Sequence, residues 1–269
     1  MDLTQDCSIY RFEAGRPVAA TDKVITEARI ELDIGDGRYR VSLLCLPHDL
    51  EALAVGFLVG ETVLRRREDL AGVEVRPEAG QVLVRGRFDE EALEGLSRQW
   101  TRGTGCGSGG TSRLLAAAGR MPLAAGLTIG PDRLGELTEM FHARAALWRE
   151  TGGVHACALA SADGLVGFAE DIGRHNAFDK IIGRAFLDNI NISDKLVLTT
   201  GRISAEIVSK AIACGARMLV SRSAVTSLAV SLARRYNLTL VGFLRGRRLS
   251  VYTAYHRIAG ACGQAEGTT

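Results

Sequence analysis

Residues 195–244, KLVLTTGRISAEIVSKAIACGARMLVSRSAVTSLAVSLARRYNLTLVGFL, decide the fold of this chain. Three short runs within them, KLVLTT, RMLVS and LTLVGFL, are rich in apolar and β-branched residues, as is typical of strands buried on both faces. Two segments with helical periodicity, residues 203–214 and 225–236, separate these runs and end at Gly215 and Asn237. The alternation of strand and helix predicts a parallel sheet with right-handed crossovers.

The sequence just before this stretch predicts further elements of the same domain. The runs VHACALAS and LVGFAE, which meet at Asp163-Gly164, predict a hairpin. Helices are expected over residues 134–149 and 176–187, where apolar residues recur at helical spacing. The C-terminal part is therefore predicted to be an α/β domain.

The N-terminal third predicts a smaller α+β domain. The strand-like runs ARIELDI and YRVSLLCL flank a turn at residues 35–37, and VEVRP and QVLVRGRF flank a second turn at 78–80, with a helix over 50–64 between the pairs. Residues 102–112, RGTGCGSGGTS, hold five glycines, which exclude a stable helix or strand. We expect an α+β domain over residues 1–101, a mobile loop over 102–112 and a second domain over 113–269.

Composition narrows the class of protein. Hydrophobic residues make up 46% of the 269 residues and charged residues 24%, which is ordinary for a globular protein. No apolar run is long enough to span a bilayer, and the N-terminus lacks the apolar core of a secretion signal. We expect a cytoplasmic protein with reduced cysteines, no bound metal, and no nucleic acid or membrane among its partners.

Charge is spread unevenly along the chain. Residues 207–265 contain no Asp or Glu but nine Lys and Arg residues, whereas the rest of the chain carries 24 basic and 31 acidic residues, a net of −7. This asymmetry indicates an anionic partner for the C-terminal part, with a merely solvated basic face as the alternative.

Arginines follow the ends of the three predicted parallel strands. Ligands of open parallel sheets bind beyond the carboxyl ends of the strands, and free N–H groups at helix N-termini there favour anions. Arginine offers a planar fork to phosphate, and glycine lets the backbone approach a ligand. The sequence thus predicts a nucleotide-like ligand on residues 200–204, 221–223 and 244–248, with Gly201, Arg202, Ser221, Arg222, Leu244, Arg245, Gly246, Arg247 and Arg248 as candidate contacts.

Two polar segments, residues 151–155 and 170–176, are expected to close the same site. The second precedes a predicted helix and contains Asp171 and His175. Either residue could instead cap that helix and have no other role, so a structural reading stays open beside the ligand-binding one.

Cys106 is the candidate for covalent chemistry. A lone cysteine is most often a small buried hydrophobe, and Cys157 and Cys214, on a predicted strand and helix, fit that description. Cys106 lies among glycines with no apolar neighbour to bury it, which favours an exposed, reactive thiol. A glycine-rich phosphate cradle is a weaker alternative, since the Lys-Ser/Thr of a P-loop is missing.

Several long segments resemble one protein family. TGGVHACAL, EDIGRHNAFDKIIG, TTGRISAEIVSKAIACG, SRSAVTSLAVSLARRYNLTLVGFLRG and VYT, together with PHDLEALAVGFLVGE near the N-terminus, resemble the FdhD family of formate dehydrogenase accessory proteins. The resemblance covers nearly the whole chain and is specific, because the segments match in order.

The resemblance implies a sulfur carrier, that is, a sulfurtransferase acting through a cysteine persulfide. Such proteins take sulfur from a cysteine desulfurase and pass it to the molybdenum cofactor in its bis-molybdopterin guanine dinucleotide form, before insertion into formate dehydrogenase. The family implies a cytidine deaminase-like, three-layer C-terminal domain and a homodimer. It places the cofactor, with guanine nucleotides as its mimics, on Phe243, Leu244, Arg245, Gly246, Arg247 and Arg248.

The chain departs from the family at one point. The family usually carries CxxC in its mobile loop, whereas this chain has Cys106-Gly107-Ser108-Gly109, with glycine in place of the second cysteine. A single thiolate can still attack a persulfide donor. The alternative is a non-catalytic chaperone that binds the molybdenum cofactor. A zinc deaminase is set aside, because HxE and PCxxC are absent.

Overall fold

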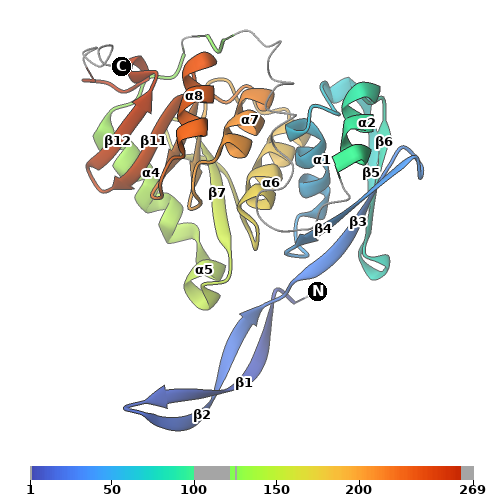
Figure 1. Ribbon diagram of the computed structural model, residues 1–269, viewed down its shortest axis with the longest axis vertical. Helices are drawn as coiled ribbons and strands as arrows, with labels where there is room; N and C mark the ends of the chain where they lie inside the picture. Colours follow the sequence, from blue (N-terminus) through green and yellow to red (C-terminus); the bar gives the residue numbers. More distant parts are fainter. Residues whose placement is uncertain (1, 100–121, 125, 262–269) are drawn as a thin grey trace.

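The computed structural model describes residues 2–99, 122–124 and 126–261 (Figure 1). Its larger sheet has six strands in the order β12-β11-β10-β9-β7-β8. β9, β10 and β11 are parallel, as the sequence predicts, while β7 is antiparallel to β9 and forms the predicted hairpin with β8. The strands are β7 (His155–Ala160), β8 (Leu165–Asp171), β9 (Leu196–Thr199), β10 (Met218–Ser221), β11 (Thr239–Arg245) and β12 (Arg248–Thr253).

Helices cover both faces of this sheet. One face packs on the helices that follow β8, β9 and β10 in the chain, and the other packs on a helix that precedes β7. These three layers confirm the expected α/β architecture of the C-terminal part. The helices are α6 (Arg174–Leu187), α7 (Ala205–Cys214) and α8 (Ser227–Arg235) on the first face, and α4 (Pro131–Arg144) with the short α5 (Ala146–Thr151) on the second.

The N-terminal part contains the four predicted strands in one sheet and the predicted helix α1, with a second helix, α2, that the sequence did not predict. Its strand order is β4-β3-β6-β5, and α1 packs between this sheet and α6 (Figure 1). The predicted boundary at residues 102–112 lies outside the described residues, so the division there stays a prediction. The elements are β3 (Ala28–Ile34), β4 (Tyr39–Cys45), β5 (Leu70–Arg76), β6 (Gln81–Gly86), α1 (Leu50–Gly60) and α2 (Glu90–Gln99), with short 3-10 turns at Arg67–Asp69, Pro77–Ala79 and Tyr255–Arg257.

Helices α1 and α6 cross in near-contact at two glycines. A Cβ added at Gly56 would lie 1.7 Å from the carbonyl oxygen of Asp179, and one added at Gly183 would lie 1.8 Å from that of Ala52. The two helix backbones are therefore closer together than they could be if either glycine carried a side chain. This crossing fixes α1 against α6, one of the helices that cover the larger sheet.

The structure adds a long hairpin that the sequence did not predict. β1 (Thr4–Glu13) and β2 (Arg16–Ile25) pair over ten residues each and turn at Ala14-Gly15, where both residues have positive φ. Figure 1 shows this hairpin, called the arm below, extending away from the rest of the chain. Both faces of the arm are largely exposed, so no alternation of buried residues marks its strands in the sequence.

Two further details differ from the prediction. The single helix predicted over residues 134–149 is two helices, because the chain leaves helical geometry at Ala145, with φ −75° and ψ 75°. The strand β12 was not predicted, and it makes residues 244–248 the end of β11, a tight turn and the start of β12.

Candidate functional site

The ends of the parallel strands meet at one edge of the larger sheet. Thr199 is paired with Ser221, and the Ser221 hydroxyl donates to the carbonyl oxygen of Gly201 at 2.7 Å. On the next strand, β11, the Phe243 amide donates a hydrogen bond to the Ser223 carbonyl oxygen, which follows β10, at 3.1 Å. Of the residues predicted for the ligand, Gly201, Ser221 and Phe243 are thus brought together, and Arg202 and Arg222 are exposed beside them.

The arginine turn projects beyond this edge. β10 and β11 pair in register as far as Val220 and Val241, and Phe243 has φ +52°, so the chain leaves regular strand geometry before Arg245. Leu244 is buried, whereas Arg245 and Arg248 are exposed and flank the turn at Gly246. Arg247 reaches Asp132, at the start of α4, at 2.9 Å. The turn therefore offers guanidinium groups to solvent at the rim of the strand-end site.

A second group of polar residues lies at the same edge, next to β9. The side chain of Arg174 folds over Gly201, where an added Cβ would come within 2.9 Å of it. His155 Nδ1 lies 3.2 Å from the Thr200 hydroxyl, which also accepts from the Ala156 amide at 3.0 Å. The first turns of α6 and α7 meet here through His175 and Glu206, 3.0 Å apart. Arg174, His155 and Glu206 were not singled out from the sequence, although segments 151–155 and 170–176 were.

Unpartnered hydrogen-bond donors, rather than the titratable groups, suit this group to an anion. Burial, followed by the nearby charges of Arg174 and His175, lowers the pKa of His155 below its usual range, so His155 is neutral at pH 7. Contact with His175 lowers the pKa of the Glu206 carboxyl, which stays ionised. Within the described residues, Arg174 Nε and Ser204 Oγ are buried without a hydrogen-bond partner. Neither N-cap, Gly173 of α6 or Ser204 of α7, makes a side-chain cap bond, so these helix N-termini keep donors for a ligand.

Asp171, predicted as a ligand contact, is held by the protein itself. Its side chain is fully buried; Oδ1 accepts from the Gly173 amide and Asn176, and Oδ2 accepts from the Leu46 amide. Lys180 adds a buried ion pair at 2.7 Å. These partners agree with the structural alternative considered for Asp171.

The basic C-terminal stretch is less uniform than its sequence indicates. Lys210 is buried, pairing with Asp179 at 2.6 Å and Glu61 at 3.6 Å where α1, α6 and α7 meet. Arg257 is fully buried and donates hydrogen bonds to the carbonyl oxygens of Asn237 and Ala124. Two of the nine positive charges therefore hold the fold together, and the remaining seven are arginines.

The environment of the other cysteines bears on which thiol can react. Cys45 and Cys157 are fully buried, and burial raises the pKa of each thiol to about 12. Cys214 is half-buried on α7, with its thiol 3.3 Å from the Ala211 carbonyl, and Cys7 is exposed on the arm. Cys106 lies outside the described residues, as does Cys262.

We predict that alkylation will separate these thiols. At pH 7.5 a thiol of pKa about 12 is ionised in fewer than about one molecule in 10⁴, and burial also blocks the reagent. Iodoacetamide should label Cys7 in the folded protein and should label Cys45 and Cys157 only after unfolding in urea. Peptide mass spectrometry measures each site, and rapid labelling of folded Cys157 would contradict this assignment.

Two classes of feature are absent from the part of the chain that the structure describes. None of its helices has the length and apolarity needed to cross a membrane. No group of three or more His, Cys, Asp or Glu side chains within it is arranged to hold a metal ion.

Comparison with known proteins gives consistent matches. The profile of the FdhD/NarQ family matches residues 25–259. "Sulfur carrier protein FdhD" of Wolinella succinogenes is 38% identical over 92% of this chain and 87% of its own length, and that of Listeria innocua is 35% identical over 96% and 100%. The crystal structure of a proposed formate dehydrogenase accessory protein from Desulfotalea psychrophila superposes with a TM-score of 0.80 at 26% identity, covering 96% of this chain and 100% of that one.

Proposed function

The chain belongs to the FdhD/NarQ family, and we propose that it carries sulfur from a cysteine desulfurase to the molybdenum cofactor of formate dehydrogenase. The Cys106 thiolate attacks the terminal sulfur of the desulfurase persulfide. An S–S bond forms at Cys106 as the donor's S–S bond breaks, and the desulfurase cysteine leaves as a thiolate. The sulfur stays at the sulfane level throughout, so this step needs no oxidant or reductant.

The observation that carries this proposal is the anion-binding character of the strand-end site. Arg174 Nε and Ser204 Oγ are buried there without partners among the described residues, beside the free N-termini of α6 and α7. A dinucleotide form of the molybdenum cofactor carries phosphates, which such donors favour. In this proposal the cofactor is the substrate that receives sulfur, and the protein holds it without a metal of its own.

We propose that the ligand lies across the ends of the three parallel strands. Gly201 and Ser221 lie at the ends of β9 and β10, where Arg202 and Arg222 supply charge and His175 lies against Glu206. From the end of β11, through the turn, to the start of β12, the contacts are Phe243, Leu244, Arg245, Gly246, Arg247 and Arg248. Leu244 is buried and contributes packing, while the three arginines reach the phosphates from the rim.

The partners follow from this role. They are a cysteine desulfurase, formate dehydrogenase and a second copy of the chain. Sulfur transfer takes place in the cytoplasm. Gly109, in place of a second loop cysteine, favours one alternative, in which the chain is a chaperone that binds the cofactor without carrying sulfur. The two functions differ in whether Cys106 must be a thiol.

Complementation tests the proposal. In a bacterial strain that lacks its own family member, expression of this chain should restore formate dehydrogenase activity. The soluble chain and the dehydrogenase polypeptide must both be present at normal levels. If the dehydrogenase is then still inactive, the result counts against a role of this chain in its maturation.

We also predict that Arg245→Ala weakens binding of GDP, used as a mimic of the guanine dinucleotide, by about ten-fold. The loss corresponds to one charge-assisted hydrogen bond to phosphate. Titration calorimetry at fixed ionic strength measures it. Arg235→Ala is the matched control, because Arg235 is equally an exposed arginine but lies at the far end of α8. Equal affinity of the Arg245 variant and the unmodified protein would place the phosphates elsewhere.

A further inference from the structure

The arm lacks the packing that a two-stranded sheet normally needs. Two paired strands without a third strand or a helix are marginally stable in water. The register places Tyr10 opposite Ala19 and Phe12 opposite Pro17, so these four residues share one face. Tyr10 is 74% exposed and Phe12 is 71% exposed. An exposed aromatic face on a protruding hairpin indicates that a protein surface covers it.

The arm is fixed at its root and directed away from its own chain. Lys23 forms an ion pair with Glu150 of α5 at 2.7 Å, and Ile25 packs against Gly153. Pairing between β1 and β2 continues without a bulge from Thr4 to Glu13, a reach of about 34 Å. Figure 1 shows the arm bending along its length, with its tip beyond the body of the same chain.

A second uncovered surface lies beside this root. β8 is the last strand of the larger sheet, and it has no partner on its outer side among the described residues. Met140 of α4, Trp148 of α5 and Val166 of β8 are each 40–45% exposed along this edge, and we call them the β8 patch. Met140 lies against Gly164, and the Trp148 amide donates to Glu170 at 2.9 Å, which holds both helices along β8.

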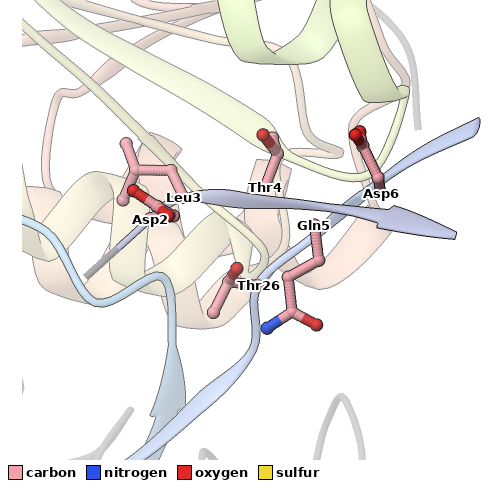
Figure 2. Close-up of a pocket in the computed structure, with 6 residues that line it drawn as sticks. All are labelled: Asp2, Leu3, Thr4, Gln5, Asp6 and Thr26. Carbon is pink, nitrogen blue, oxygen red and sulfur yellow. The ribbon is translucent and has the colours of Figure 1, made fainter.

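An open hollow lies at the root of the arm. It has a volume of about 810 Å³ and is lined by Asp2, Leu3, Thr4, Gln5, Asp6 and Thr26 (Figure 2). Thr26 Oγ1 is buried there and has no hydrogen-bond partner within the described residues. The hollow has no Cys, His, Lys or Arg in its lining, and it is formed by the arm's root rather than by the strand ends.

We propose that two copies of the chain exchange arms, so that the aromatic face of each arm covers the β8 patch of the other copy. The exchange deepens the proposed homodimer and rests on it, but it does not depend on sulfur transfer. Because arm and patch lie side by side on one chain, a two-fold axis satisfies both at once without any other protein. The family profile begins at residue 25, so the arm lies outside the region by which the family is recognised.

Charge and area favour a second copy over another occupant. Residues 4–25 contain three acidic and three basic side chains, a net charge of zero, so recognition relies on apolar surface and two arms do not repel each other. Two arms offer four aromatic side chains, each able to bury roughly 150 Å². With the surface that they cover, this gives about 1,200 Å², which reaches the lower range of stable protein interfaces.

The test compares three variants of the full chain by size-exclusion chromatography with light scattering. The arm variant is Tyr10→Ser with Phe12→Ser, and the patch variant is Met140→Ser with Trp148→Ser. The control is Val18→Ser, which removes an exposed apolar side chain at the same level of the arm but on its other face. We expect dimers for the unmodified chain and the control, and monomers for the arm and patch variants. Far-UV circular dichroism and the thermal midpoint verify that each variant folds.

Mixing the two monomeric variants distinguishes arm exchange from general loss of an interface. A heterodimer of the arm variant and the patch variant keeps one intact arm on one intact patch, so mixing should restore dimers, with weaker affinity than the unmodified chain. An unmodified chain that is a monomer, or an arm variant that stays dimeric, overturns the exchange. Monomeric variants that fail to associate on mixing overturn the β8 patch as the arm's site. Sulfur loading of Cys106, measured on the same samples, reports separately on the proposed function.

Discussion

Replacing Cys106 with alanine is expected to abolish restoration of formate dehydrogenase activity by this chain, to below about 1% of the level with Cys106 present. The proposed transfer forms an S–S bond at this sulfur, and alanine has no sulfur to form it. Two of the other cysteines are unsuited to replace it, because burial raises the pKa of Cys45 and Cys157 to about 12. The measurement is dehydrogenase activity in extracts of a strain that lacks its own family member.

Cys7→Ala is the matched control for that experiment. Cys7 is the exposed thiol of the described residues, and it lies on the arm, away from the strand-end site. We expect its loss to leave the restored activity unchanged. Full activity of Cys106→Ala would instead support the chaperone alternative, in which the chain binds cofactor without carrying sulfur.

Gly183→Ala is expected to cost about 4 kcal/mol of unfolding free energy, enough to deplete the folded protein. Its new Cβ would lie 1.8 Å from the backbone carbonyl oxygen of Ala52, and backbone cannot swing aside as a side chain can. Helices α1 and α6 would have to separate, exposing apolar surface on both. Urea unfolding followed by circular dichroism measures the loss.

Gly72→Ala controls for the general effect of replacing glycine. A Cβ at Gly72, on β5, meets nothing within 4 Å, and its φ does not require glycine. We expect a change within about 0.5 kcal/mol. Equal unfolding midpoints for Gly183→Ala and the unmodified chain would show that the α1–α6 crossing is looser than described.

The larger sheet was predictable because its pattern is local. Each parallel strand is a short apolar run, and each crossover helix ends at a helix-stopping residue, such as Gly215, which has φ +82°. The arm was not predictable in this way. Its strands are exposed on both faces, and its stability in our account comes from another molecule, which one sequence does not display.

The candidate site was predictable in outline. Parallel strands bring their carboxyl ends to one edge, so Gly201 and Ser221 could be placed together before any contact was known. The roles of individual charges could not be assigned. Asp171 was a predicted contact and Lys210 belongs to the acid-free basic stretch, yet both are buried in ion pairs whose partners, Lys180 and Asp179, are brought to them by packing.

Arg174 shows the converse case. It stands in a segment marked by its polarity, but its closeness to Gly201 depends on how α6 meets the end of β9. Glycine at 201 is required because the arginine side chain occupies the space of a Cβ. Only the packed structure shows this relation between two residues 27 positions apart in the chain.

Mass spectrometry of Cys106 tests the central claim most directly. The full chain is incubated with a cysteine desulfurase and cysteine, trapped with an alkylating reagent, digested and mapped. We predict that the peptide containing Cys106 gains one sulfur atom, that the addition requires both desulfurase and cysteine, and that dithiothreitol removes it. A Cys106 peptide without added sulfur, from a desulfurase that is active in the same tube, would contradict the account of this chain as a sulfur carrier.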